Sequence, residues 1–276
     1  MSNATVTPVF FVHLLRAMRA VVGREINRFL RQPSRLASAL VRPLLWFVVF
    51  SAGFHNVFGV SIVPPYETYV EYQVYMVPGL LGMVALFNGM QSSLSMVYDR
   101  EMGVMRLLLT APLPRGWLLA FKLMGGTSLS LLQMVVFMLI SLAFGVEFSW
   151  QHLPLMLLTM VTGATLLAAM GLMLSVYIKQ LENFAGTMNF VIFPMFFISP
   201  ALYPLWKLDE SGAWWLLTLA QWNPFTHVVE AIRFAMYGQV NALSWTVVVV
   251  GATVFFCLAW WGYDPQRGWI KQRCAA

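Results

Sequence analysis

The sequence predicts an all-α membrane protein with six transmembrane helices, an N-terminal amphipathic helix and a helical hairpin before the last span. Hydrophobic residues make up 59% of the chain and charged residues 10%, whereas water-soluble domains carry about 45–50% apolar and about 25% charged residues. Six stretches reach the ~20 residues that cross a hydrocarbon core of about 30 Å. They cover residues 43–62, 74–97, 118–145, 153–178, 184–205 and 245–263. Their length and the absence of short alternating segments favour helices over the strands of a barrel.

Residues 8–32 precede the first span and show the spacing of an amphipathic helix. Apolar side chains such as Leu15, Met18 and Val22 recur with a period of about 3.6 residues, and arginines including Arg24 and Arg31 occupy the other face. Because the first span follows so closely, there is little room for a separate soluble domain. We therefore expect this helix to lie in the membrane interface, with its arginines among anionic headgroups.

The basic residues predict the orientation of the chain. If the N-terminus is cytoplasmic, all of the 17 lysines and arginines except Lys207 and Arg233 fall on the cytoplasmic side. This asymmetry follows the positive-inside rule and places both termini and residues 98–114 in the cytoplasm. The net charge of +6 is then explained by membrane orientation, and no nucleic-acid partner is expected.

Residues 98–114, YDREMGVMRLLLTAPLP, form a short charged segment between two apolar runs. We name this the coupling segment. Its leucines would be costly to expose to water, so they should bury against the bundle or a partner. For Glu101 two roles are open: contact with a partner subunit, or stabilisation of a helix N-terminus through the dipole, worth ~0.3–1 kcal/mol. The candidate contact residues are Asp99, Arg100, Glu101, Gly103, Leu107, Leu108, Thr110 and Pro112.

Residues 206–243 form a long connection before the last span, and they are rich in apolar and aromatic side chains. Helical spacing is visible on both sides of Asn223 and Pro224, but each half is too short to cross a bilayer. A re-entrant pair of half-helices entering from the outer face fits this pattern. His227, Glu230 and Arg233 follow at i, i+3 and i+6, so neighbours can pair. They could line an outer gate or form a salt bridge that satisfies buried charges.

Both motifs resemble those of ABC-2 type transporter permeases, and the resemblance covers nearly the whole chain. The matching residues are Glu101, Gly103, Leu107, Leu108, Thr110 and Pro112 in the coupling segment, and Asn223, Pro224, Phe225, Thr226, His227, Glu230 and Arg233 before the last span. The resemblance implies a permease in a bacterial cytoplasmic membrane, with two copies of this chain and two copies of a separate ATP-binding cassette subunit. ATP and Mg would bind to that subunit, and this chain would carry no cofactor. The implied cargo is amphipathic: a drug-like molecule, a lipid or a lipid-linked glycan.

The residues offer no pattern of an enzyme. There is no glycine-rich phosphate loop, no paired His and Glu at metal-site spacing and no serine nucleophile elbow, so catalytic and metal sites are not expected. Ionisable residues are scarce within the predicted spans, His55 being the main one, which argues against a proton-coupled carrier. Two alternatives stay open. A membrane scaffold would not stimulate a partner's ATP hydrolysis in response to a ligand, and an ATP-independent carrier would keep transporting without ATP.

Overall fold

The computed structural model describes residues 6–31, 33–54, 59–60, 64–66, 70–103, 115–178 and 180–263, and these are mostly helical. The helices are α1 (Val6–Leu30), α2 (Pro33–Phe54), α3 (Tyr72–Glu101), α5 (Arg115–Ala143), α6 (Leu153–Tyr177), α7 (Leu181–Phe197), α8 (Trp206–Glu210), α9 (Trp214–Trp222), α10 (Pro224–Met236) and α11 (Ala242–Gly262). Two short strands, β1 (Gly59–Val60) and β2 (Val70–Glu71), pair antiparallel. The helical character predicted from the sequence is confirmed.

Four of the described helices are long and apolar enough to cross a membrane. These are α3, α5 from Gly116 onward, α6 and α11. The apolar part of α2, Leu40–Gly53, is shorter, and α7 has 17 residues. The structure thus supports a membrane-embedded helical bundle, and the count of six spans stays a prediction.

The centre of the bundle is the contact between α3 and α6, where glycines let two backbones approach closely. A Cβ atom on Gly89 would lie 2.9 Å from the backbone nitrogen of Ala168, and one on Gly171 would lie 2.9 Å from the carbonyl oxygen of Gly89. Larger side chains at either position would push the helices apart, as in other small-residue helix contacts in membranes. The two helices therefore form a tightly packed core around which the others are arranged.

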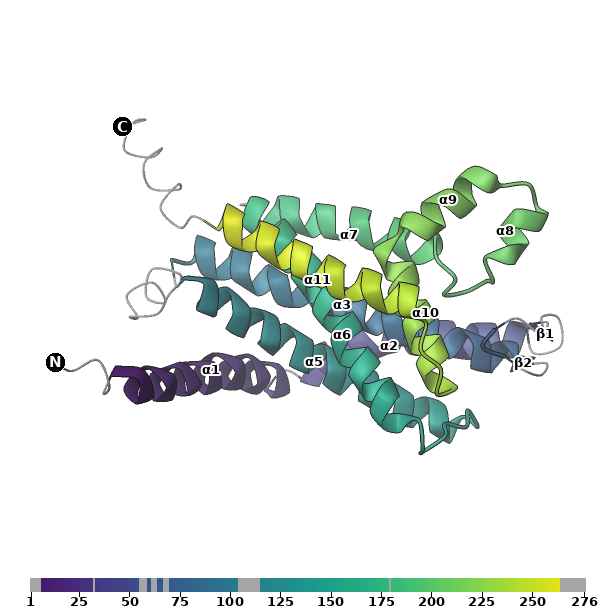
Figure 1. The fold of residues 1–276 in the computed structure, drawn as a ribbon, viewed down its shortest axis with the longest axis horizontal. Coiled ribbons are helices and arrows are strands. Elements are labelled where there is room, and N and C mark those ends of the chain that lie inside the picture. Colours follow the sequence, from purple (N-terminus) through teal and green to yellow (C-terminus); the bar gives the residue numbers. More distant parts are fainter. Residues whose placement is uncertain are drawn as a thin grey trace.

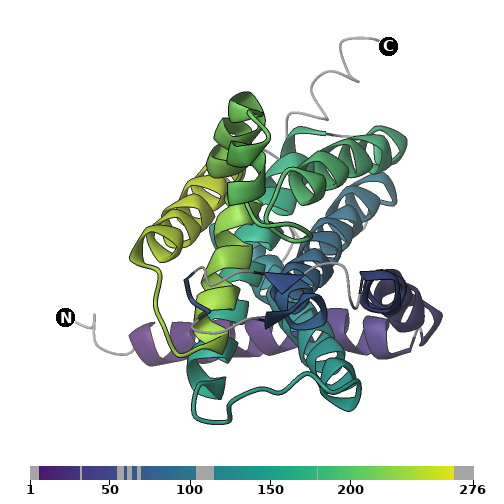
Figure 2. The ribbon, with the colours of Figure 1, turned by 90° about the vertical axis from the view of Figure 1, so that its right-hand side faces the viewer.

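The described elements reach two opposite ends along the longest axis of the molecule. The start of α1, the end of α3, the start of α5 and the end of α11 lie at one end, on the left in Figure 1, which we call the α1 end. The strands and α8 and α9 lie at the other, which we call the hairpin end. In Figure 2, α1 runs across the direction of the other helices. This arrangement brings segments far apart in sequence together at each end.

Two predicted helix boundaries are wrong. The stretch predicted as the first span, 43–62, is displaced: α2 starts at Pro33 and ends at Phe54, and Gly59–Val60 is a strand. Proline is compatible with the first turn of a helix, which explains the early start. The stretch 184–205 also ends early, because α7 stops at Phe197. Pro200 follows closely and disfavours helical geometry in the residue before it.

Candidate functional site

The coupling segment begins where α3 ends, and the helix end has a defined geometry. Gly103 has a φ angle of 72°, a left-handed conformation that glycine adopts without a Cβ penalty and that commonly terminates helices. The N–H of Gly103 donates to the carbonyl of Arg100 at 3.2 Å, and the N–H of Met102 donates to that of Tyr98 at 3.0 Å. The glycine thus stops the helix directly after Glu101.

Glu101 joins the end of α3 to the start of α7. Its Oε1 accepts a hydrogen bond from the backbone N–H of Leu181, the first residue of α7, at 2.8 Å. The first N–H groups of a helix lack partners within the helix and carry positive partial charge, so a carboxylate stabilises them. The helix-dipole role foreseen for Glu101 is therefore observed, but at a helix 80 residues further along the chain.

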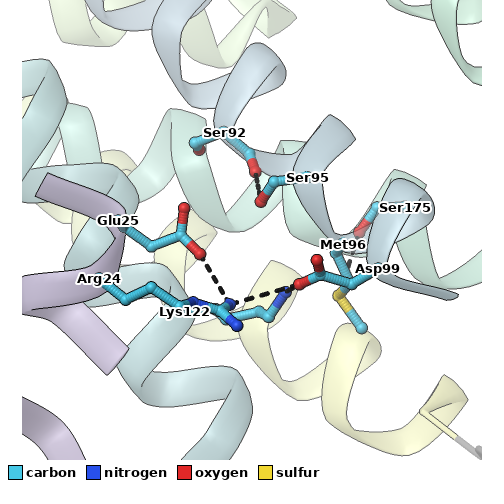
Figure 3. A network of polar contacts seen from close by, with 8 residues as sticks. All are labelled: Arg24, Glu25, Ser92, Ser95, Met96, Asp99, Lys122 and Ser175. Carbon is cyan, nitrogen blue, oxygen red and sulfur yellow. Dashed lines mark hydrogen bonds and ion pairs between the residues drawn. The ribbon is translucent and has the colours of Figure 1, made fainter. Parts of the chain in front are cut away.

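Asp99, two residues before the end of α3, is the centre of a charged network between three helices (Figure 3). Its Oδ2 lies 2.7 Å from Nζ of Lys122 on α5, and the two side chains are 5% and 6% exposed. The same oxygen lies 3.4 Å from a guanidinium nitrogen of Arg24 on α1. Arg24 also pairs with Glu25 at 3.0 Å. One buried carboxylate thereby holds α1, α3 and α5 together.

A small cavity lies beside this network. Its volume is about 40 Å³, and its lining includes Glu25, Lys122, Asn88 and Ser92. One water needs about 10–15 Å³ by this measure, so the cavity has room for two or three waters. Glu25 and Lys122 consequently border a space with room for water, where ion pairs can exchange partners at less cost than in a closely packed apolar core.

The remaining predicted residues of the coupling segment do not belong to this charged network. Arg100 is half-buried and interacts electrostatically with Tyr263 at the end of α11. Leu107, Leu108, Thr110 and Pro112 lie outside the described residues. Sequence reasoning missed Arg24, Glu25 and Lys122 as site residues. The available signal was Lys122 itself, a charge within a long apolar run that requires a buried partner.

At the hairpin end, Arg233 is 3% exposed and makes several contacts at once. Its guanidinium pairs with Glu230, donates to the carbonyl of Pro200 at 2.6 Å and lies 4.2 Å from the ring centroid of Tyr75. Tyr75 donates to the same carbonyl at 3.1 Å. Burial raises the pKa of nearby Tyr66 well above its usual range, although Arg233 acts in the opposite direction. The cluster is thus a fixed junction between α3, α10 and the chain after α7.

Asn223 stands at the break between α9 and α10 and organises the turn. Its Oδ1 accepts from the N–H of Phe225 at 3.0 Å, an N-cap contact, and Pro224 occupies the first helical position. Its Nδ2 donates to the carbonyls of Met195 and Ile198 at 2.7 and 3.0 Å. Two helices therefore meet at Asn223, where the sequence predicts a helix break. Their insertion into the membrane as a re-entrant hairpin stays a prediction.

His227 does not join the predicted polar cluster. A ring nitrogen of His227 lies 3.0 Å from the carbonyl oxygen of Gln221, in the preceding helix α9. Glu230 and Arg233 pair with each other as their spacing predicted. The salt-bridge interpretation is therefore observed for these two residues, and the histidine instead supports the turn between α9 and α10.

These features define an integral membrane protein whose apolar helical bundle carries a polar cluster at each end. The sequence profile of the ABC-2 type transporter family matches residues 16–237, and the chain belongs to this family. It is 25% identical over 257 residues to the inner membrane transport permease YadH of Escherichia coli K12, covering 91% of this chain and 96% of that protein. It is 30% identical over 243 residues to the putative transport permease ycf38 of Cyanophora paradoxa, covering 84% and 77%.

A further relative is the daunorubicin resistance ABC transporter permease protein DrrB1 of Streptomyces coeruleorubidus. The two sequences are 24% identical over 255 residues, covering 90% of this chain and 81% of that protein. Membership of the family makes the chain a membrane-embedded transport permease and not an enzyme in its own right. It also implies an ABC transporter system with an ATP-binding partner.

Proposed function

We propose that this chain is the permease subunit of an ATP-driven exporter in a bacterial cytoplasmic membrane, assembled from two copies of the chain and two ATP-binding cassette subunits. Its cargo would be an amphipathic drug-like molecule, lipid or lipid-linked glycan. The names of two relatives support this proposal, because YadH is called an inner membrane permease and DrrB1 a daunorubicin resistance permease. The basic residues gathered on one predicted side support cytoplasmic termini.

The observation that carries the proposal is the arrangement around the end of α3. Glu101 binds the start of α7, and Asp99 binds Lys122 of α5 and Arg24 of α1; both acidic residues lie in the first part of the coupling segment. A displacement of the coupling segment by an ATPase subunit would consequently move three other helices through short polar contacts. Polar contacts between helices that can adopt two discrete arrangements provide a physical means of coupling distant sites.

Co-purification of the ATPase subunit tests the proposal. The native protein is solubilised gently, and the amount of ATPase recovered per permease is compared for wild type, Glu101→Ala and Glu182→Ala. Glu182 is a matched control, because it is an exposed carboxylate in the first turn of α7. We expect wild type and Glu182→Ala to retain the ATPase. With Glu101→Ala, we expect about fivefold less ATPase to be recovered, which corresponds to about 1 kcal/mol of binding free energy. Absence of an ATPase from the wild-type protein would overturn the proposal.

A further inference from the structure

A second cavity lies inside the bundle between α2, α3 and α5. Its volume is about 70 Å³, and its polar lining consists of Arg42 from α2, Gln91 from α3 and Gln133 from α5. Apolar lining comes from Pro43, Met83, Val84 and Phe87. The family relationship and the charged network at the α1 end do not account for this cavity.

Gln133 is a buried amide without a partner. The residue is 1% exposed, and both Oε1 and Nε2 lack a hydrogen-bond partner among the described residues. An unsatisfied buried polar group costs ~1–3 kcal/mol, so native structures rarely leave both ends of an amide unpaired. The cavity that Gln133 borders should therefore contain a polar occupant.

Arg42 brings a positive charge to the same cavity. Its guanidinium lies 4.0 Å from the ring centroid of Phe87, and no carboxylate among the described residues forms an ion pair with it. Phe87 lies near the middle of α3, about 21 Å from Glu101 at 1.5 Å per residue. The assignment of Arg42 to the cytoplasmic side from the sequence stays a prediction. An arginine at this depth is costly and commonly marks a functional site.

We propose that this cavity binds the anionic headgroup of an amphipathic molecule. Carboxylate or phosphate oxygens would accept hydrogen bonds from the guanidinium of Arg42 and from the amide of Gln133, as in other charge-assisted pairs. Stacking on Phe87 leaves the N–H groups at the guanidinium edge free to donate. Water alone would satisfy Gln133 but would leave Arg42 without a counter-charge.

The surroundings fit a ligand with an apolar tail. The cavity is large enough for a headgroup but not for a whole lipid, since one water already needs about 10–15 Å³. Gln133 closes the buried side, whereas Arg42 is exposed on α2. Leu45 and Val49, which are 58% and 59% exposed, continue along the same helical face as Arg42. A tail would lie along these side chains. The inference holds whether or not transport is driven by ATP.

Native mass spectrometry of the full chain in mild detergent tests the site. Phosphatidylglycerol and phosphatidylcholine with identical tails are added to wild type, Arg42→Gln, Arg42→Lys, Gln133→Leu and Arg31→Gln. The last is the matched control, because Arg31 is exposed at the end of α1 and the same charge is lost. We expect wild type and Arg31→Gln to retain phosphatidylglycerol about tenfold better than phosphatidylcholine. Arg42→Gln and Gln133→Leu should lose this preference, and Arg42→Lys should keep part of it.

Two further readouts complete the design. Thermal unfolding of each variant shows that it is folded. Dodecyl phosphate is a single-chain probe. If it displaces phosphatidylglycerol, the site binds the anionic headgroup of amphipathic molecules in general, including that of a transported compound. If it does not, the occupant is a resident diacyl lipid. Equal lipid retention by wild type, Arg42→Gln and Gln133→Leu would show that the cavity holds only water and would overturn the proposal.

Discussion

The two ends of the molecule each pair an acid with a buried base, but they do so in different ways. At the hairpin end, Arg233 pairs with Glu230 one turn earlier in the same helix, and its other contacts are a carbonyl and an aromatic ring. At the α1 end, Asp99 pairs with Lys122 and Arg24, which belong to two other helices. Arg24 has a side chain that is 38% exposed.

This difference indicates what each end is built to do. The Arg233 guanidinium is 3% exposed and is held at once by a carboxylate, a backbone carbonyl and an aromatic ring, so the hairpin end is fastened to α3 as one unit. A carboxylate that is shared by two cations, one of which lines a cavity with room for water, has alternatives within reach. Helices joined in that way can shift relative to one another while their charges stay paired. The α1 end therefore has the contacts expected of a coupling element, and the hairpin end those of a fixed support.

The largest expected effect is that of Asp99→Asn. It would leave Lys122 buried without a counter-charge, which costs ~3–5 kcal/mol for buried pairs. The double variant Asp99→Asn with Lys122→Met should recover most of this loss, because an uncharged pair of similar size removes the desolvation penalty. Unfolding in detergent measures both. If Asp99→Asn is as stable as wild type within experimental error, the claim that the Asp99 network stabilises the protein is contradicted.

An intermediate effect is expected for Arg233→Met, about 2–3 kcal/mol, because Glu230 is partly exposed and can be hydrated when unpaired. Adding Glu230→Gln should recover little, since the bond to Pro200 and the contact with Tyr75 are lost regardless. The same unfolding experiment measures this. If the second substitution restores stability at the α1 end but not at the hairpin end, the difference between the two ends is supported. If both double variants are as stable as wild type, the two ends do not differ in this way.

The smallest expected effect on stability is that of Arg24→Gln, ~1 kcal/mol or less, because its side chain is partly exposed and its pair with Asp99 is long. Salt should reduce this effect further, since exposed charges are screened. A double-mutant cycle with Asp99→Asn at low and high salt isolates the coupling between the two residues. A coupling that is large and insensitive to salt would mean that α1 is fixed as firmly as the hairpin end.

The sequence predicted the features that depend on local pattern. Helical periodicity and the break at Asn223 and Pro224 follow from neighbouring residues, and the structure shows both. The contacts between helices were not predictable in this way. Asp99 and Arg24 are 75 residues apart, and Glu101 and Leu181 are 80 apart. Their meeting depends on how the helices pack, which a single sequence does not display.

Arg42 illustrates a second limit. In the sequence it precedes an apolar run, so it was grouped with the basic residues that flank membrane spans. The structure extends α2 back to Pro33 and sets the guanidinium against Phe87 near the middle of α3. The hydropathy of α2 gives the approximate position of its apolar stretch. The position of Arg42 relative to α3 depends on the tilt and register of α2 against α3, which hydropathy does not give.

The most direct test of the account is the ATP hydrolysis of the complex in lipid nanodiscs, measured with and without amphipathic compounds. Wild type, Glu101→Ala and the control Glu182→Ala are compared. The account predicts that certain compounds raise hydrolysis in wild type and in Glu182→Ala, and that Glu101→Ala loses this response because the hydrogen bond between the end of α3 and the start of α7 is lost. An unchanged response in Glu101→Ala would contradict the claim that the end of α3 couples the permease to its ATPase.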